Sequence, residues 1–116
     1  MTTKIYHNPR CSKSRQTLQL LTDNNVEPEI IEYLKTPPTK EELTEILNAL
    51  NMKPRQLMRK NEADYKENNF SDEQLSDEQL IDMMVRFPKV IERPIVVTSD
   101  KQFALGRPPE NVLDII

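Results

Sequence analysis

The stretch Lys4-Ile5-Tyr6-His7-Asn8-Pro9-Arg10-Cys11 decides the fold of this chain of 116 residues. Its first four residues include a β-branched and an aromatic residue and stop at Asn8-Pro9, which predicts a strand that ends in a turn. Residues 12–23 lack proline and glycine and contain three leucines, so they predict a helix. Cys11 is therefore expected at the N-terminus of that helix.

Residues 28–34 predict a second strand, because they contain two isoleucines and a tyrosine and are followed by Thr36-Pro37-Pro38. The chain thus opens as β-α-β. A helical block comes next. Thr39 and Glu42 form a capping-box pattern ahead of apolar residues at helical spacing, and Pro54 suits the first position of a short helix.

A five-residue repeat follows, in which Ser71-Asp72-Glu73-Gln74-Leu75 is repeated as Ser76-Asp77-Glu78-Gln79-Leu80. One interpretation is an acidic interaction motif. The other is local, because the second copy forms a capping box ahead of apolar residues at helical spacing. A period of five matches no repeat architecture, so we favour a helix that ends before Pro88.

The last part of the chain predicts a hairpin and a helix. Residues 95–98 and 102–105 are typical of two strands joined by a tight turn, and Gly106 ends the second. Pro108-Pro109 can open a last helix, since proline is tolerated in a first helical turn.

The order β-α-β and then β-β-α predicts an α/β fold with a small mixed sheet. Because strands flank the helical block on both sides, we interpret residues of about 39–87 as an insertion between the two halves. Residues 1–116 are accordingly expected to form a single domain.

The composition excludes several kinds of site. The chain contains one cysteine, one histidine and one glycine, namely Cys11, His7 and Gly106. The single cysteine and histidine exclude an intramolecular disulfide and the usual four-ligand zinc site, so we expect no metal. The single glycine excludes a Walker loop and a G-x-G-x-x-G dinucleotide loop, and we expect no bound cofactor.

Net charge and hydropathy indicate the cellular location and the partners of the chain. The net charge of −3 argues against nucleic acid and anionic membranes as general partners. No run approaches the roughly 18 apolar residues of a membrane helix, and the first residues lack the pattern of a signal peptide. We expect a cytoplasmic protein in which Cys11 is a free thiol.

A thiol at a helix N-terminus is a candidate nucleophile. Unpaired backbone N–H groups and the helix dipole favour the thiolate and lower its pKa. The cations Arg10, Lys13 and Arg15 act in the same direction, and the hydroxyl of Ser14 can donate to the sulfur. The alternative is that Cys11 is a small buried hydrophobic residue, which is the commoner fate of a free cysteine.

The same helix end can bind an anion, because its backbone donors point outward together. Arginine suits a tetrahedral oxyanion, since its planar fork offers paired donors. Three arginines stand where predicted elements end, namely Arg59, Arg93 and Arg107. They can equally be solvated surface charges, and spacing alone does not bring them to Cys11.

Five motifs occur in order along the chain. They are Tyr6-His7-Asn8-Pro9-Arg10-Cys11-Ser12-Lys13-Ser14-Arg15, Tyr33-Leu34-Lys35-Thr36-Pro37-Pro38, Leu57-Met58-Arg59-Lys60-Asn61, Glu92-Arg93-Pro94-Ile95-Val96-Val97 and Gly106-Arg107-Pro108-Pro109. Together they resemble the ArsC family of glutaredoxin-linked arsenate reductases, and most closely its short, YfgD-type members. The resemblance covers nearly the whole chain and implies a thioredoxin-like fold with a helical insertion.

The resemblance also implies a mechanism. Cys11 would attack arsenate, and Arg59, Arg93 and Arg107 would hold the oxyanion. Glutathione would then act as the reducing cosubstrate, arsenite would leave, and glutaredoxin would reduce the remaining mixed disulfide. An outside thiol also fits the composition, because the chain has no second cysteine.

Three further residues match family positions near the thiol. Pro94 corresponds to the proline that thioredoxin-like folds hold in the cis form. His7 and Ser14 would tune the pKa of Cys11, although His7 can equally be an imidazole that caps the end of a strand.

Two other functions remain open. One is a glutathione-dependent thiol/disulfide oxidoreductase that acts on protein or small-molecule disulfides, which the cations around Cys11 would also serve. The other is a regulator like Spx, a thioredoxin-like relative that binds RNA polymerase. Spx-type proteins commonly carry C-x-x-C, where this chain has Cys11-Ser12-Lys13-Ser14.

Overall fold

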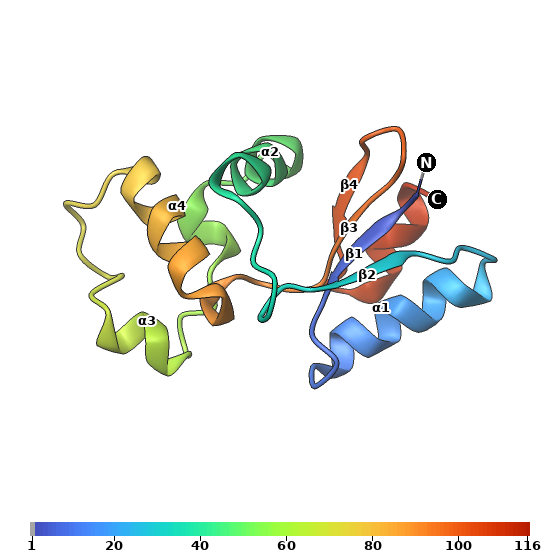
Figure 1. The fold of residues 1–116 in the computed structure, drawn as a ribbon, viewed down its shortest axis with the longest axis horizontal. Helices are drawn as coiled ribbons and strands as arrows, with labels where there is room; N and C mark the ends of the chain where they lie inside the picture. The colour runs from blue at the N-terminus through green and yellow to red at the C-terminus, as the bar shows by residue number, and fades with distance from the viewer. Residues whose placement is uncertain (1) are drawn as a thin grey trace. The chain divides into compact units, whose positions relative to one another are not determined.

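The computed structural model describes residues 2–116 and divides them into two compact units (Figure 1). The sheet unit comprises the residues up to Thr36 together with Arg93–Ile116, and the helical unit comprises Pro37–Glu92. The predicted insertion, at about residues 39–87, falls within the helical unit.

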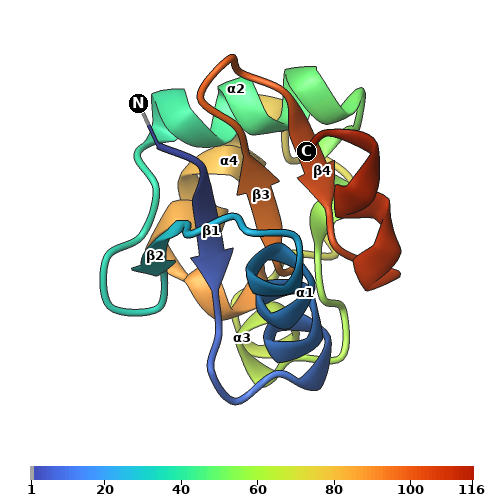
Figure 2. The same cartoon turned by 90° about the vertical axis from the view of Figure 1, so that its right-hand side faces the viewer.

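In its described part, the sheet unit contains four strands, one α-helix and one 3₁₀ helix. They are β1 (Lys4–His7), α1 (Ser12–Asp23), β2 (Glu29–Glu32), β3 (Ile95–Val97), β4 (Phe103–Leu105) and η3 (Pro109–Asp114). The strands lie in the order β2-β1-β3-β4 (Figure 2). Strands β1 and β2 are parallel, whereas β3 is antiparallel to both β1 and β4, so the predicted mixed α/β sheet is confirmed.

This topology brings three loops to one end of the sheet. Tyr6, near the end of β1, pairs with Ile95 at the start of β3, and Ile95 in turn pairs with Leu105 at the end of β4. The segment after β1, the segment before β3 and the segment after β4 therefore leave the sheet at the same end. These segments carry Cys11, Arg93 and Arg107.

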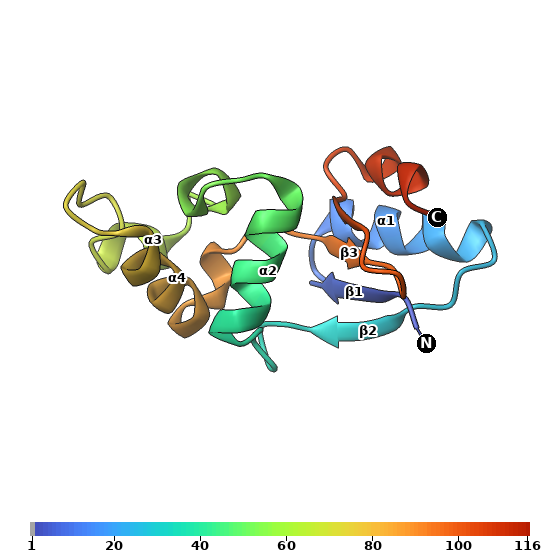
Figure 3. The ribbon, with the colours of Figure 1, turned by 90° about the horizontal axis from the view of Figure 1, so that it is seen from above.

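One face of the sheet is covered by α1 and η3, which contact each other (Figure 3). One apolar cluster lies on this face. It contains Ile5 of β1, Val96 of β3 and Ala104 of β4, together with Leu21 of α1 and Val112 of η3. All but Ala104 are completely buried. This core holds the N-terminus of α1 beside the end of the sheet.

The single glycine has a packing role. A Cβ atom at Gly106 would lie 2.6 Å from Thr17 Oγ1 and 2.8 Å from Pro94 Cγ, closer than Cβ atoms approach other atoms in real proteins. The backbone N–H of Gly106 donates to the carbonyl oxygen of Pro94 at 2.9 Å. Gly106 therefore allows helix α1 and the segments before β3 and after β4 to meet closely.

The helical unit contains three α-helices and two 3₁₀ helices among its described residues. They are α2 (Lys40–Leu50), η1 (Pro54–Leu57), α3 (Ala63–Glu67), α4 (Asp77–Arg86) and η2 (Pro88–Val90). The capping boxes predicted at Thr39 and Ser76 are both present, and α4 ends before Pro88 as expected. The core of the unit includes Leu43, Ile46, Leu57, Phe70, Leu80, Met84 and Val90.

Strands β3 and β4 are each one residue shorter than predicted, and larger differences from the prediction occur at three other places. Strand β2 stops at Glu32, because the carbonyl oxygen of Glu32 accepts turn hydrogen bonds from the N–H groups of Lys35 and Thr36. Helix α3 was not predicted, since none of its residues is buried and it has no apolar periodicity to detect. The C-terminal segment is a 3₁₀ helix closed by i→i+3 bonds such as Asn111 N–H to Pro108 O.

Within the described residues, none of the helices has both the length and the apolar character needed to span a membrane.

Candidate active site around Cys11

A short turn presents Cys11 at the start of α1. The Cys11 N–H donates to the carbonyl oxygen of Asn8 at 3.0 Å, and the side chain of Asn8 accepts from the N–H of Arg10 at 3.0 Å. Cys11 is the N-cap residue of α1 and adopts the extended backbone conformation that N-cap residues favour. Cys11 forms no disulfide, and the residue is partly exposed.

The surroundings of Cys11 favour the thiolate. Partial burial raises the pKa of the thiol, but the backbone N–H of Ser14, the guanidinium of Arg93 and the backbone N–H of Lys13 lower it further than burial raises it. The net result is a pKa below that of an ordinary cysteine. A larger fraction of Cys11 is therefore ionised at neutral pH than in a free thiol.

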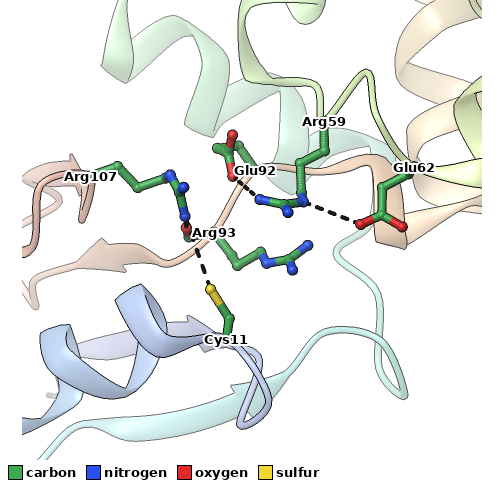
Figure 4. A network of polar contacts seen from close by, with 6 residues as sticks. All are labelled: Cys11, Arg59, Glu62, Glu92, Arg93 and Arg107. Carbon is green, nitrogen blue, oxygen red and sulfur yellow. Dashed lines mark hydrogen bonds and ion pairs between the residues drawn. The ribbon is translucent and has the colours of Figure 1, made fainter.

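Two arginines of the sheet unit lie at the sulfur (Figure 4). Nη1 of Arg107 donates to Cys11 Sγ over 4.0 Å and to the carbonyl oxygen of Arg93 at 3.3 Å. Arg93 acts on the thiol both by hydrogen bonding and by its charge. The structure thus brings together Cys11, Arg93 and Arg107, which are up to 96 residues apart in the sequence.

The structure adds Arg93 to the cations that lie next to Cys11 in the sequence. Arg10 and Lys13 are exposed, and Arg15 donates from Nη1 to the carbonyl oxygen of Pro9 at 3.0 Å. Arg93 supplies the charge that lowers the pKa of Cys11. Sequence proximity does not indicate Arg93, because strand pairing brings it to Cys11 from the other half of the chain.

His7 and Ser14 form a buried pair that contacts the turn before Cys11. His7 Nδ1 lies 2.7 Å from Ser14 Oγ, and Ser14 Oγ accepts from the backbone N–H of Asn8 at 3.0 Å. The predicted bond from the Ser14 hydroxyl to the sulfur is not among the contacts of this hydroxyl. Instead the hydroxyl joins His7 to the turn, and Ser14 favours the thiolate through its backbone N–H.

The ring of His7 is held in the neutral form at neutral pH. Burial lowers the pKa of His7, the charge of Glu32 opposes this effect, and the charge of Arg15 adds to it. His7 is 5% exposed. A neutral ring suits a role in positioning Ser14 better than a role as a proton donor.

Two X-Pro bonds near the site are cis. The Arg93–Pro94 bond has the cis geometry that the family resemblance implies, and the Arg107–Pro108 bond is also cis, which the sequence did not indicate. Each therefore directly follows an arginine that lies at the sulfur.

Arg59 belongs to the helical unit, where two carboxylates hold it. Arg59 Nη1 lies 2.8 Å from Glu92 Oε1, and Arg59 Nε lies 3.4 Å from Glu62 Oε1 (Figure 4). Sequence reasoning missed both carboxylates. The i,i+3 spacing of Arg59 and Glu62 could have indicated one of them, whereas Glu92 depends on a long-range contact.

Comparison with solved protein structures identifies the fold class of this chain. The mixed sheet, with a cysteine at the N-terminus of its first helix, is the thioredoxin-like fold shared with a solved arsenate reductase from Vibrio cholerae. That structure is 50% identical, has a TM-score of 0.93 and covers 100% of this chain and 98% of its own.

The family follows from the sequence comparisons. The model of the ArsC family matches residues 6–115, so this chain belongs to the ArsC family. The YfgD protein of Escherichia coli strain K12 is 55% identical over 97% of this chain and 95% of its own length. An arsenate reductase of the same strain is 44% identical over 97% of this chain and 79% of its own length.

Proposed function

We propose that this chain is an arsenate reductase in which Cys11 is the nucleophile. The proposal rests on one observation above all, the thiol of lowered pKa on the partly exposed residue Cys11, beside Arg93 and Arg107. It is supported by the 44% identity to an arsenate reductase of Escherichia coli.

The chemistry begins with attack of the Cys11 thiolate on arsenic. One arsenate oxygen is protonated and leaves as water, and a covalent bond joins the sulfur to arsenic(V). The thiol of glutathione then attacks this adduct, and arsenic takes up two electrons and leaves as arsenite. Those electrons come from the two sulfurs, which end as a mixed disulfide between Cys11 and glutathione.

Glutaredoxin would reduce the mixed disulfide and return the Cys11 thiol. An outside reductant is part of the proposal, because the chain has no second cysteine to resolve the intermediate. Glutathione is abundant in reducing compartments, so we place the protein in the cytoplasm.

The arginines would hold the oxyanion and the charge that develops during attack. Arg93 and Arg107 present guanidinium forks beside the sulfur, and such forks match the oxygens of a tetrahedral anion. We include Arg59 as a third anion ligand on the strength of the family resemblance. His7 and Ser14 would tune the thiolate through the turn, and they would not contact the substrate.

A coupled assay tests the proposal. With glutathione, glutaredoxin and glutathione reductase present, arsenate should cause NADPH consumption and the release of arsenite. Cys11→Ser should abolish both, and Arg93→Ala should lower the rate by two orders of magnitude or more, in line with the loss of an oxyanion donor.

The same assay separates the alternative function. If arsenate gives no turnover above the buffer blank while a small glutathione mixed disulfide is reduced in a Cys11-dependent way, the chain is a thiol/disulfide oxidoreductase. Turnover of neither substrate removes both enzymatic assignments.

A further inference from the structure

Arg59 is held between two carboxylates of its own unit. The bond to Glu92 is short, at 2.8 Å, and the contact with Glu62 is longer, at 3.4 Å. The three side chains are only 27%, 20% and 28% exposed, respectively. Solvent therefore screens these charges less than it screens a surface ion pair.

The backbone builds this arrangement. Met58 and Ile91 form an isolated antiparallel bridge, flanked by hydrogen bonds from Arg59 N–H to Val90 O at 2.7 Å and from Glu92 N–H to Leu57 O at 2.8 Å. The side chains of Arg59 and Glu92 thus project from two adjacent backbone segments, and these hydrogen bonds fix the register of the two segments. The Glu62 N–H donates to the carbonyl oxygen of Arg59 at 3.3 Å, which keeps the second carboxylate near the same guanidinium.

The charge balance at Arg59 opposes anion binding. One guanidinium and two carboxylates carry a net charge of one negative unit, whereas an arginine alone would present one positive unit. Glu92 occupies one N–H donor of Arg59 Nη1, so an oxyanion that binds this side of the guanidinium competes with Glu92. The nearby carboxylates also repel an anion of the same sign.

We propose that Glu92, assisted by Glu62, competes with the oxyanion for Arg59 and so sets the anion affinity of the site. This inference rests on the proposed function, in which Arg59 is an anion ligand. Glu92 and Glu62 act through Arg59 and are positioning residues. They reduce the affinity for a multiply charged oxyanion, and they keep the Arg59 side chain ordered when no anion is bound.

Calorimetric titration of the full chain with sulfate and with inorganic phosphate, two tetrahedral oxyanions that the Cys11 thiolate does not attack, tests the inference. Glu92→Gln keeps the shape of the side chain and removes its charge, so the dissociation constant should fall about three- to tenfold. Glu62→Gln should give a smaller gain. A structural defect would weaken binding, so a gain in affinity distinguishes competition from damage.

A double variant shows whether the effect passes through Arg59. In the background of Arg59→Gln, the change Glu92→Gln should tighten binding clearly less than it does in the unaltered protein, because only the direct repulsion of the anion by the carboxylate is then removed. Glu78→Gln is the matched control, because it also removes one carboxylate from the helical unit. The carboxylate of Glu78 pairs with Lys40 at 2.8 Å and not with Arg59. Its dissociation constants should equal those of the unaltered protein.

The outcomes separate this inference from the proposed function. If both anions bind the unaltered protein and Glu92→Gln binds no tighter, the competition is overturned and the oxyanion site stands. An equal gain in the Arg59→Gln background also overturns the competition. If neither anion binds the unaltered protein or any variant, the proposed oxyanion site is overturned and the inference falls with it.

Discussion

Arg107 donates from one guanidinium nitrogen to both the sulfur of Cys11 and the carbonyl oxygen of Arg93. This nitrogen links the turn after β1, the segment before β3 and the segment after β4 at a single point. The carbonyl contact limits where the Arg107 side chain can move, so the cation stays at the thiol in the absence of substrate.

The first prediction concerns the pKa of Cys11. Burial raises this pKa, whereas the Ser14 N–H and the Arg93 guanidinium lower it by a larger amount. Arg93→Gln should therefore raise the apparent pKa and slow alkylation by iodoacetamide at neutral pH, measured as rate against pH. Arg10→Gln, which removes an exposed neighbouring cation, should have the smaller effect. The reverse order of the two effects would contradict the assignment of Arg93.

The second prediction concerns His7, the only histidine of the chain. Burial lowers its pKa in the folded state below the ordinary 6.5, with Glu32 opposing and Arg15 adding to the effect. The unfolded chain then binds the proton more readily. The stabilisation is complete above about pH 6.5 and is lost as the pH falls through the folded-state pKa.

Urea unfolding at a series of pH values checks this dependence. The unaltered protein should lose stability below pH 6.5 more steeply than His7→Gln does, since the variant has no imidazole to protonate. Nitrogen-15 NMR of the single imidazole reports the folded-state pKa directly. A value at or above the ordinary one would be inconsistent with the burial of the ring.

The third prediction concerns Gly106. An added methyl group meets Thr17 Oγ1 at 2.6 Å and Pro94 Cγ at 2.8 Å, so Gly106→Ala should lower the free energy of unfolding by about 1–3 kcal/mol. Thermal or urea unfolding measures the loss. Adding Thr17→Ala should cost less in the Gly106→Ala background than alone, because it removes one of the two clashing side chains. A fully additive pair would argue against this close approach.

The fourth prediction uses the five-residue repeat as its own control. Ser76 caps α4 and accepts from the Gln79 N–H, whereas Ser71 begins no helix. Ser76→Ala should destabilise the protein by about 1 kcal/mol, and Ser71→Ala should have almost no effect. Equal effects on the midpoint of urea unfolding would contradict the capping role.

Local patterns predicted much of the fold. The strand, turn and helix around Cys11 follow from residues adjacent in the sequence, as do the capping boxes at Thr39 and Ser76. Helix α3 escaped prediction because none of its residues is fully buried and they lack apolar spacing. Helices and strands can be predicted where one buried face gives the sequence a regular apolar spacing, and they are hard to predict where no face is buried.

Local sequence patterns predicted only part of the candidate active site. Cys11 was found because the helix N-terminus is a local feature. Arg93 and Arg107 reach the sulfur through pairing of β3 with β1 and β4, which local spacing does not encode, and the family resemblance was needed to select them. Glu92 as the partner of Arg59 came from the structure alone.

The most direct test of the central claim is the covalent state of Cys11 after a single turnover. The full chain is mixed with glutathione and arsenate, without glutaredoxin, and its intact mass is measured. We predict a mixed disulfide of Cys11 with glutathione that appears only with arsenate, is absent with sulfate and absent in Cys11→Ser, and is accompanied by one equivalent of arsenite. Unmodified Cys11 and no arsenite under these conditions would contradict the assignment of this site to arsenate reduction.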